Sequence, residues 1–214
     1  MNAPDFRFFL TLTLLVFCGE LLSATREDTW NFKVYLDDQP VGYHRFLLTQ
    51  DEAGRKMRSE ARFDVKFLMF NAYAYSHQAD ETWRGDCLAE LRAETDDNGD
   101  VSKVNGNVRN GTFRLLRGKD EAKLPDCVMT FAYWHPRMLE QQRLLNPQNG
   151  EYTEVRIAFR GEEPIPVRGK AVTARRYHLE SPRFQIDLWY ADDRRWVALD
   201  SRLENGRLLR YRIE

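Results

Sequence analysis

The sequence predicts a mainly β protein, a curved antiparallel meander of about 11–12 strands with one short helix. Apolar and polar residues alternate along most of the chain, which is the period of a strand with one buried face. Asn-Gly pairs, which favour tight hairpin turns, recur at five places. Only one segment carries helix signals, so the strands are expected to be joined mostly by short loops.

The N-terminal segment precedes the β pattern and is predicted to be a secretory signal peptide over residues 1–24. A short stretch with Arg7 is followed by an apolar run from Phe8 to Phe17 and then by small residues ending at Ala24. A membrane anchor requires a longer apolar run than Glu20 allows. A lipoprotein would use Cys18, but the bulky Phe17 precedes it. We therefore expect an exported protein, periplasmic or extracellular.

The strands are expected in chain order from their alternating apolar residues. The longest places Met57, Ser59, Ala61, Phe63, Val65, Phe67 and Met69 on one face, with charged residues between them. The same alternation predicts further strands around Trp30–Leu36, Val155–Phe159, Phe184–Tyr190, Val197–Leu203 and Leu209–Ile213. The five pairs expected at turns are Asn98-Gly99, Asn105-Gly106, Asn110-Gly111, Asn149-Gly150 and Asn205-Gly206.

The exception to the β pattern is the segment from Pro136 to Asn146. Pro136 suits the first position of a helix, and Asn146-Pro147 suits its end. A helix of two to three turns is expected here, with Met138, Leu139, Leu144 and Leu145 as its apolar contacts.

The remaining chain, residues 25–214, is expected to form a single β-rich domain, because no linker or repeat divides it. A sheet of this length is not expected to stay flat with both edges bare. It should curl into a half-barrel, a barrel or a sandwich whose apolar face becomes an interior.

Composition excludes some classes of protein. Aromatic residues make up 13% of the 214 residues and the net charge is −1, which argues against disorder and against a nucleic-acid binder. Removing residues 1–24 takes two acids and one base from the 33 and 32 present, leaving 31 of each.

Cys87 and Cys127 are then the remaining cysteines, and in an exported chain they are expected to form one disulfide. A redox-active pair or a metal site is the alternative, but neither cysteine belongs to a C-x-x-C motif.

The interior is expected to be rich in large aromatic side chains, which either fill a solid core or line a pocket for an apolar ligand, with the 136–146 helix as a lid. Interior candidates are Trp30, Phe32, Phe63, Phe67, Tyr73, Tyr75, Phe159, Phe184 and Tyr190. The residues expected to contact a ligand are Phe63, Phe67, Tyr73, Tyr75, His77, His44 and Trp134.

Histidines are the other candidate functional groups. His44 is expected to approach His77 across the sheet, and His135 follows an aromatic run; three histidines at one cavity would suggest metal binding or acid–base chemistry. Structural histidines bonded to nearby hydroxyls are the ordinary alternative. No catalytic or metal-binding motif is present, so neither a metal nor a cofactor is expected.

Several runs are distinctive enough to compare with known families: Val41–Phe46, Tyr73-x-Tyr75-x-His77, Glu81-x-Trp83, Cys87-Leu88, Cys127–Trp134, Leu144–Gly150 and Leu188-Trp189-Tyr190. Together they resemble a family of exported bacterial proteins that is a domain of unknown function. The resemblance covers nearly all of residues 25–214 and implies no catalytic residue. In layout the chain is also similar to exported carriers of the lipoprotein-carrier type, which devote more of the chain to helices.

Three functions remain open. The first is an exported binding or carrier module for a lipid or other apolar molecule, the default use of a concave apolar site. The second is a structural or partner-binding protein of the cell envelope with a filled core. The third is an enzyme that uses His44, His77 or His135, although the sequence shows no recognisable set of catalytic residues around them. Peripheral contact with a membrane is open for any of these functions.

Overall fold

A computed structural model describes residues 25–67, 70–203 and 205–214, and the side chains among these except 66, 67, 70 and 71. The predicted signal peptide, residues 1–24, and the side chain of Phe67 therefore lie outside the described part. In the described part, no helix has the length and apolar character needed to cross a membrane.

The protein is mainly β, as predicted, with fifteen strands in its described part. The first eight strands are β1 (Arg26–Leu36), β2 (Gln39–Asp51), β3 (Gly54–Phe67), β4 (Phe70–Arg84), β5 (Cys87–Asp97), β6 (Asp100–Arg109), β7 (Thr112–Arg117) and β8 (Asp120–Leu124). A 3-10 helix, η1 (Pro136–Glu140), follows. The remaining strands are β9 (Arg143–Leu145), β10 (Tyr152–Glu154), β11 (Arg156–Val167), β12 (Lys170–Glu180), β13 (Gln185–Ala191), β14 (Trp196–Arg202) and β15 (Leu208–Ile213).

Thirteen strands form one antiparallel sheet in the order β11-β12-β13-β14-β15-β1-β2-β3-β4-β5-β6-β7-β8. Most neighbours are consecutive in sequence, as expected of a meander, and β15 closes back onto β1, pairing Phe32 with Ile213. The sheet is open, because β11 and β8 end this order without pairing with each other. Strands β9 and β10 form a separate small hairpin.

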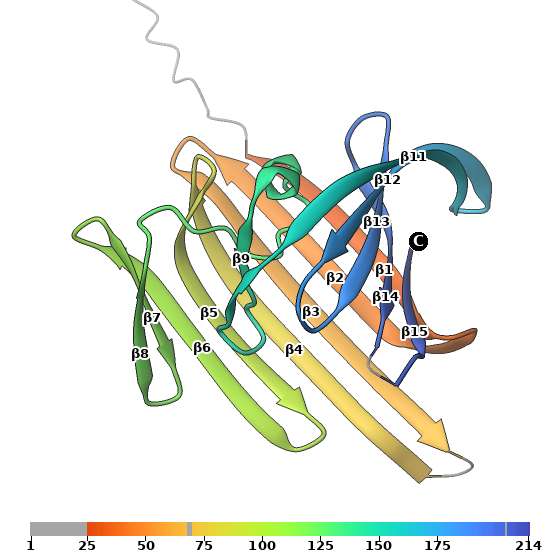
Figure 1. Ribbon diagram of the computed structural model, residues 1–214, viewed down its shortest axis with the longest axis horizontal. Helices are drawn as coiled ribbons and strands as arrows, with labels where there is room; N and C mark the ends of the chain where they lie inside the picture. The colour runs from red at the N-terminus through yellow and green to blue at the C-terminus, as the bar shows by residue number, and fades with distance from the viewer. Residues whose placement is uncertain (1–24, 68–69, 204) are drawn as a thin grey trace, which may run out of the picture.

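One face of the sheet is buried, and the alternation in the sequence predicts which face. In β1, Trp30, Phe32, Val34 and Leu36 are buried, whereas the residues between them are partly or fully exposed. In β3, Met57, Ser59, Ala61 and Phe63 are buried in the same way. The buried face becomes an interior because strands from both halves of the sheet curve around it (Figure 1).

The segment between β8 and β10, residues 125–151, crosses this interior face and is called the bridging segment. In Figure 1 its strand β9 lies in front of β4 and β5. The backbone N–H of Leu88 donates to the carbonyl of Val128 over 2.9 Å, and the Tyr190 hydroxyl donates to the carbonyl of Tyr133 over 2.8 Å. The bridging segment is therefore bonded to both halves of the sheet, at β5 and at β13.

A disulfide between Cys87 and Cys127 holds the bridging segment at its start. The two Cα atoms are 4.7 Å apart, and the bond joins the first residue of β5 to a residue just after β8. The predicted pairing of these two cysteines is confirmed.

The predicted helix over residues 136–146 is much shorter in the structure. Pro136 does begin a helical turn, but η1 ends at Glu140, and Leu144 and Leu145 belong to strand β9. Both leucines are fully buried and pair with residues of β10. Leu144 and Leu145 adopt the strand conformation because pairing with β10 and burial in the interior outweigh the helix signals of the local sequence.

Three further expectations need correction. Asn105-Gly106 is not a turn but lies inside β6, where a Cβ atom on Gly106 would overlap the ring of Phe113. Phe159, expected inside, is 50% exposed on the edge strand β11. The strand count exceeds the expected number partly because β9 and β10, with three residues each, are too short to show alternation.

Candidate ligand-binding interior

A cavity of about 280 Å³, called the inner cavity, lies between the sheet and the bridging segment. Its floor comes from β2, β3 and β4, with the side chains of His44, Phe46, Met57, Ser59, His77 and Glu81. Its roof is formed by residues 131–134 and 146–148 of the bridging segment. Its far wall comes from the region of β13 to β15 and includes Phe184, Ile186, Leu199 and Tyr211.

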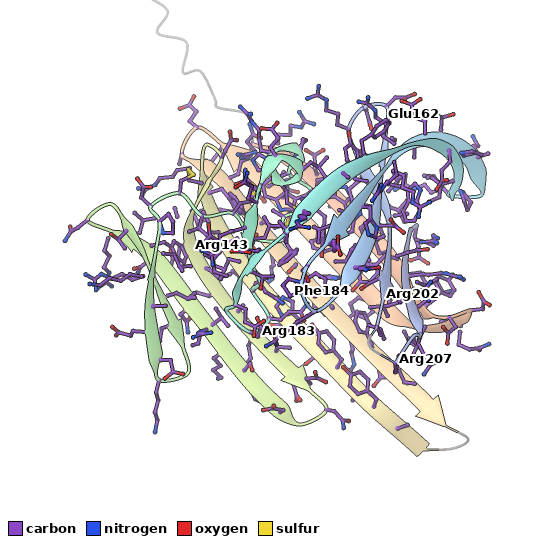
Figure 2. All side chains as sticks on the ribbon, viewed as in Figure 1. Arg143, Glu162, Arg183, Phe184, Arg202 and Arg207 are labelled. Carbon is purple, nitrogen blue, oxygen red and sulfur yellow. A yellow bond between two sulfur atoms is a disulfide. The ribbon has the colours of Figure 1, made fainter. Side chains whose placement is uncertain are left out.

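A second cavity of about 770 Å³, the outer cavity, adjoins the first. The two cavities share Gln148, Leu203, Leu209 and Tyr211 as lining residues, so they lie on either side of the same group of side chains. Its lining includes the aromatic residues Phe63, Tyr73 and Tyr75 and two charged residues, Asp97 and Arg207. Figure 2 labels Phe184 near the middle of the interior and Arg207 toward the lower right, beside the β14–β15 turn.

Aromatic side chains build the walls around both cavities. The rings of Phe63 and Tyr75 stack with their centroids 5.0 Å apart. On the other side, the Trp196 ring packs against Phe32 at 4.2 Å and against Tyr133 at 5.0 Å. These contacts are typical of well-packed aromatic clusters. Part of the interior is therefore solid, and the cavities lie between its aromatic clusters.

His44 and His77 lie in one row across the floor of the inner cavity. His44 pairs with Ala61 on β3, and Ala61 pairs with His77 on β4. Because Ala61 is small, the two imidazole rings approach to 6.5 Å between centroids and lie edge to face. The expected approach of these two histidines across the sheet is what the structure shows.

The hydrogen bonds of His77 define its tautomer. The Thr95 hydroxyl donates to the carbonyl of Gln148 over 3.1 Å, so its oxygen accepts from Nδ1 of His77, which is 2.9 Å away. The Nε2 atom of the neutral ring is then left as an acceptor. Burial lowers the pKa of His77 to about 4, so the ring is neutral at pH 7.

His44 has an unpaired ring nitrogen. Its Nε2 atom is buried and has no hydrogen-bond partner among the described residues, while its Nδ1 atom is 3.5 Å from the Tyr211 hydroxyl. The ring stacks on Phe46 with centroids 4.1 Å apart. Burial, together with the nearby His77, holds the pKa of His44 well below its ordinary value.

Glu81 is a buried carboxyl group at the far end of the same floor. It is 7% exposed and accepts a hydrogen bond of 2.9 Å from the Trp83 indole. Burial raises the pKa of Glu81 to about 7, because the low-polarity interior disfavours the charged form. A substantial fraction of this group is therefore protonated at neutral pH.

His135 does not join the other two histidines. Its Nδ1 atom accepts from the backbone N–H of Arg137 at the start of η1, and its Nε2 atom lies 3.2 Å from Asp86. Arg55 also contacts this ring. The hypothesis of three histidines at one cavity is wrong in this respect: His135 belongs to a charged cluster beside the disulfide-linked end of β5. Among the described side chains, no group of three or more His, Cys, Asp or Glu is placed to hold a metal ion.

The structure brings most of the predicted ligand-contacting residues to the two cavities. His44, His77 and Trp134 line the inner cavity, and Phe63, Tyr73 and Tyr75 line the outer one. Sequence reasoning did not include Met57, Phe131, Tyr133, Phe184 and Tyr211 among the binding residues. The alternation places Met57, Phe184 and Tyr211 on apolar faces, but only the curvature of the sheet brings them together.

The fold and its interior define a class: an open, barrel-like antiparallel sheet with cavities beneath a bridging segment. Residues 32–214 match the family model described as a domain of unknown function, DUF6134, and the chain belongs to this family. The expected membership of such a family is therefore confirmed.

Among solved structures, the fold is similar to the crystal structure of a beta-barrel-like protein of the domain of unknown function DUF1849 from Brucella abortus. The TM-score is 0.63 and the identity 8%, over 90% of this chain and 96% of that chain. At this identity the likeness shows a shared fold alone. A comparison with curated proteins gave no match.

Proposed function

We propose that this protein is an exported binding or carrier protein that holds a lipid or another apolar molecule in its two adjoining cavities. The observation that supports this most strongly is the adjacency of two cavities inside the curved sheet, which have Gln148, Leu203, Leu209 and Tyr211 in common. A chain-like molecule would occupy both cavities if these four side chains leave a passage between them.

The dimensions and chemistry of the interior agree with this role. Ligand pockets usually measure about 300–1,000 Å³ and combine apolar walls with a few polar groups. The two cavities, of about 280 and 770 Å³, have aromatic walls, and the inner floor carries two histidines and one glutamate. A protein whose core served only for stability would gain by filling such space, because empty volume costs packing energy.

Two features support export. Disulfides persist in oxidising compartments, and the Cys87–Cys127 bond fits that environment. The pattern of residues 1–24 is that of a signal peptide.

The binding test uses the neutral fluorescent dye N-phenyl-1-naphthylamine and a variant that fills the inner cavity. Ser59 is buried and lines this cavity, so Ser59→Phe places a ring in the space a ligand would occupy. Ser76, on the neighbouring strand, is exposed on the outer face of the sheet, and Ser76→Phe is the matched control. The parent protein and Ser76→Phe should bind the dye, and Ser59→Phe should bind at least about tenfold more weakly, a difference of about 1.4 kcal/mol.

Thermal unfolding of each variant accompanies the binding measurement, because overpacking can destabilise a core. Native mass spectrometry of protein purified without detergent should also show apolar molecules retained from the cell. Absence of dye binding and of any retained molecule in the folded parent protein would contradict the proposal. It would instead support the envelope protein with a filled, ligand-free core.

A further inference from the structure

The inner cavity is lined by two histidines, each of which has a ring nitrogen with no hydrogen bond among the described residues. His77 is 3% exposed and lines the cavity, and its Nε2 atom makes no hydrogen bond among the described residues, whereas Nδ1 is bonded to Thr95. The Nε2 atom of His44 is buried and also lacks a partner in the described part of the chain. Polar atoms in an interior usually have a partner, so the free Nε2 atom of His77 in the cavity lining points to a polar group that arrives with a ligand.

The chemistry of these two atoms restricts what that group is. Because Nδ1 of His77 is a donor to Thr95, its Nε2 atom accepts, and it needs a donor from the ligand. The role of Nε2 in His44 depends on the tautomer of the ring. It is an acceptor if Nδ1 donates to the Tyr211 hydroxyl, and a donor if Nδ1 accepts from that hydroxyl. A hydroxyl group both donates and accepts, so it satisfies His77 and is compatible with either state of His44.

Charge argues against an ionised head group at this position. The described residues that line the inner cavity include no lysine or arginine, so a carboxylate or phosphate would be buried there without a cation. An arginine, Arg207, lines the outer cavity instead. The inner carboxyl, Glu81, lies four residues from His77 along β4, a separation of roughly 13 Å for a strand, too far to pair with an ammonium bound at the histidines.

We propose that the inner cavity selects apolar ligands bearing a hydroxyl group, which donates a hydrogen bond to Nε2 of His77 beside the ring of His44. This inference rests on the proposed binding function and names its ligand class: an uncharged amphiphile with an alcohol at the end that enters the interior. The imidazole ring of His44 lies edge to face beside that of His77, with the ring centroids 6.5 Å apart, so the hydroxyl would bind next to both rings. The apolar remainder extends past Tyr211 toward Phe63 and Tyr75 in the outer cavity.

Displacement of bound N-phenyl-1-naphthylamine by four compounds with a chain of ten carbons tests this inference. The compounds are 1-decanol, its methyl ether, decanoate and decylamine. The parent protein should bind 1-decanol about tenfold more tightly than the ether, because the ether cannot donate to His77, and more tightly than either charged compound. His77→Leu should abolish the preference for the alcohol over the ether. The control His178→Leu, on β12 and outside both cavities, should retain the full preference.

Thr95→Val provides a second variant if His77→Leu does not fold. It removes the acceptor that fixes the tautomer of His77, so the preference for the alcohol should fall while ether binding is unchanged. Equal affinities for the alcohol and the ether, or tighter binding of decylamine or decanoate, would overturn the hydroxyl assignment alone. Failure of the dye and of all four compounds to bind would overturn the proposed function, and this inference with it.

Discussion

The Thr95 hydroxyl accepts a hydrogen bond from Nδ1 of His77 and at the same time donates a hydrogen bond to the carbonyl of Gln148. This relationship joins the sheet to the bridging segment and fixes the state of a cavity-lining histidine. Thr95 is 5% exposed, so water does not compete strongly for either bond. Thr95 therefore holds the bridging segment against the sheet and also sets the tautomer of a histidine that lines the cavity.

We expect His77 to be a neutral Nδ1–H tautomer over the physiological range. Nitrogen-15 NMR of labelled protein should show a protonated Nδ1 and an unprotonated Nε2 at pH 7, with protonation only near pH 4. Because the folded-state pKa is lower than the ordinary 6.5, the stability that neutral His77 contributes is present above pH 6.5 and is lost as the pH falls toward 4. A midpoint above pH 6 would contradict the buried, neutral ring.

Glu81 should make the protein less stable as the pH rises. Its folded-state pKa of about 7 exceeds its ordinary value of 4.5, so the folded protein holds a proton that the unfolded chain has released. Between pH 5 and pH 8, Glu81→Gln should therefore gain about 2–3 kcal/mol in unfolding free energy relative to the parent protein, at about 1.4 kcal/mol per pKa unit.

Urea unfolding of both proteins at the two pH values measures this gain. Glu94→Gln, at an exposed position on β5, is the matched control and should show no such pH-dependent gain. A constant difference between Glu81→Gln and the parent at both pH values would show that Glu81 is charged throughout the range.

The Cys87–Cys127 bond should stabilise the fold by restricting the unfolded chain. It closes a loop with a sequence separation of 40, for which the chain-entropy model gives about 4 kcal/mol. The double variant Cys87→Ala/Cys127→Ala should lower the urea midpoint accordingly, and reductant should have no further effect on it. Equal stability of the double variant and the oxidised parent would mean that the bridging segment holds its place without the bond.

Tyr190→Phe tests the attachment of the bridging segment to the second half of the sheet. The variant loses the 2.8 Å bond to the Tyr133 carbonyl and leaves that carbonyl without its donor, at a cost of about 1–2 kcal/mol. Tyr35→Phe, on the outward side of β1, is the control and should change stability by less than about 0.5 kcal/mol. Unfolding free energies that fall equally in both variants would refute a specific role for the Tyr190 bond.

The sequence predicts the strands and their buried faces well, because side-chain alternation directly reflects which side of a strand is covered. The burial of Met57, Ala61 and Phe63 on β3 follows from this rule alone. Turn prediction is less secure, since Gly106 looks like a turn residue but serves to admit the ring of Phe113. Local patterns do not report such contacts between neighbouring strands.

The candidate site could be predicted only in part, for a different physical reason. Tyr73, Tyr75 and His77 form a visible cluster in the sequence, and the approach of His44 follows from alternation on a neighbouring strand. The roof and far wall depend on the curvature of a thirteen-stranded sheet and on the path of the bridging segment. Phe184 and Tyr211 become cavity residues through these long-range features, which no local motif encodes.

The most direct test of the account is a crystal structure of the protein with 10-bromo-1-decanol, using anomalous scattering to locate the bromine. We expect the hydroxyl oxygen within hydrogen-bond distance of Nε2 of His77, and the bromine in the outer cavity near Phe63 and Tyr75. An interior with no space for the ligand, or bromine found only on the outer surface of the sheet, would contradict a hollow, ligand-binding interior.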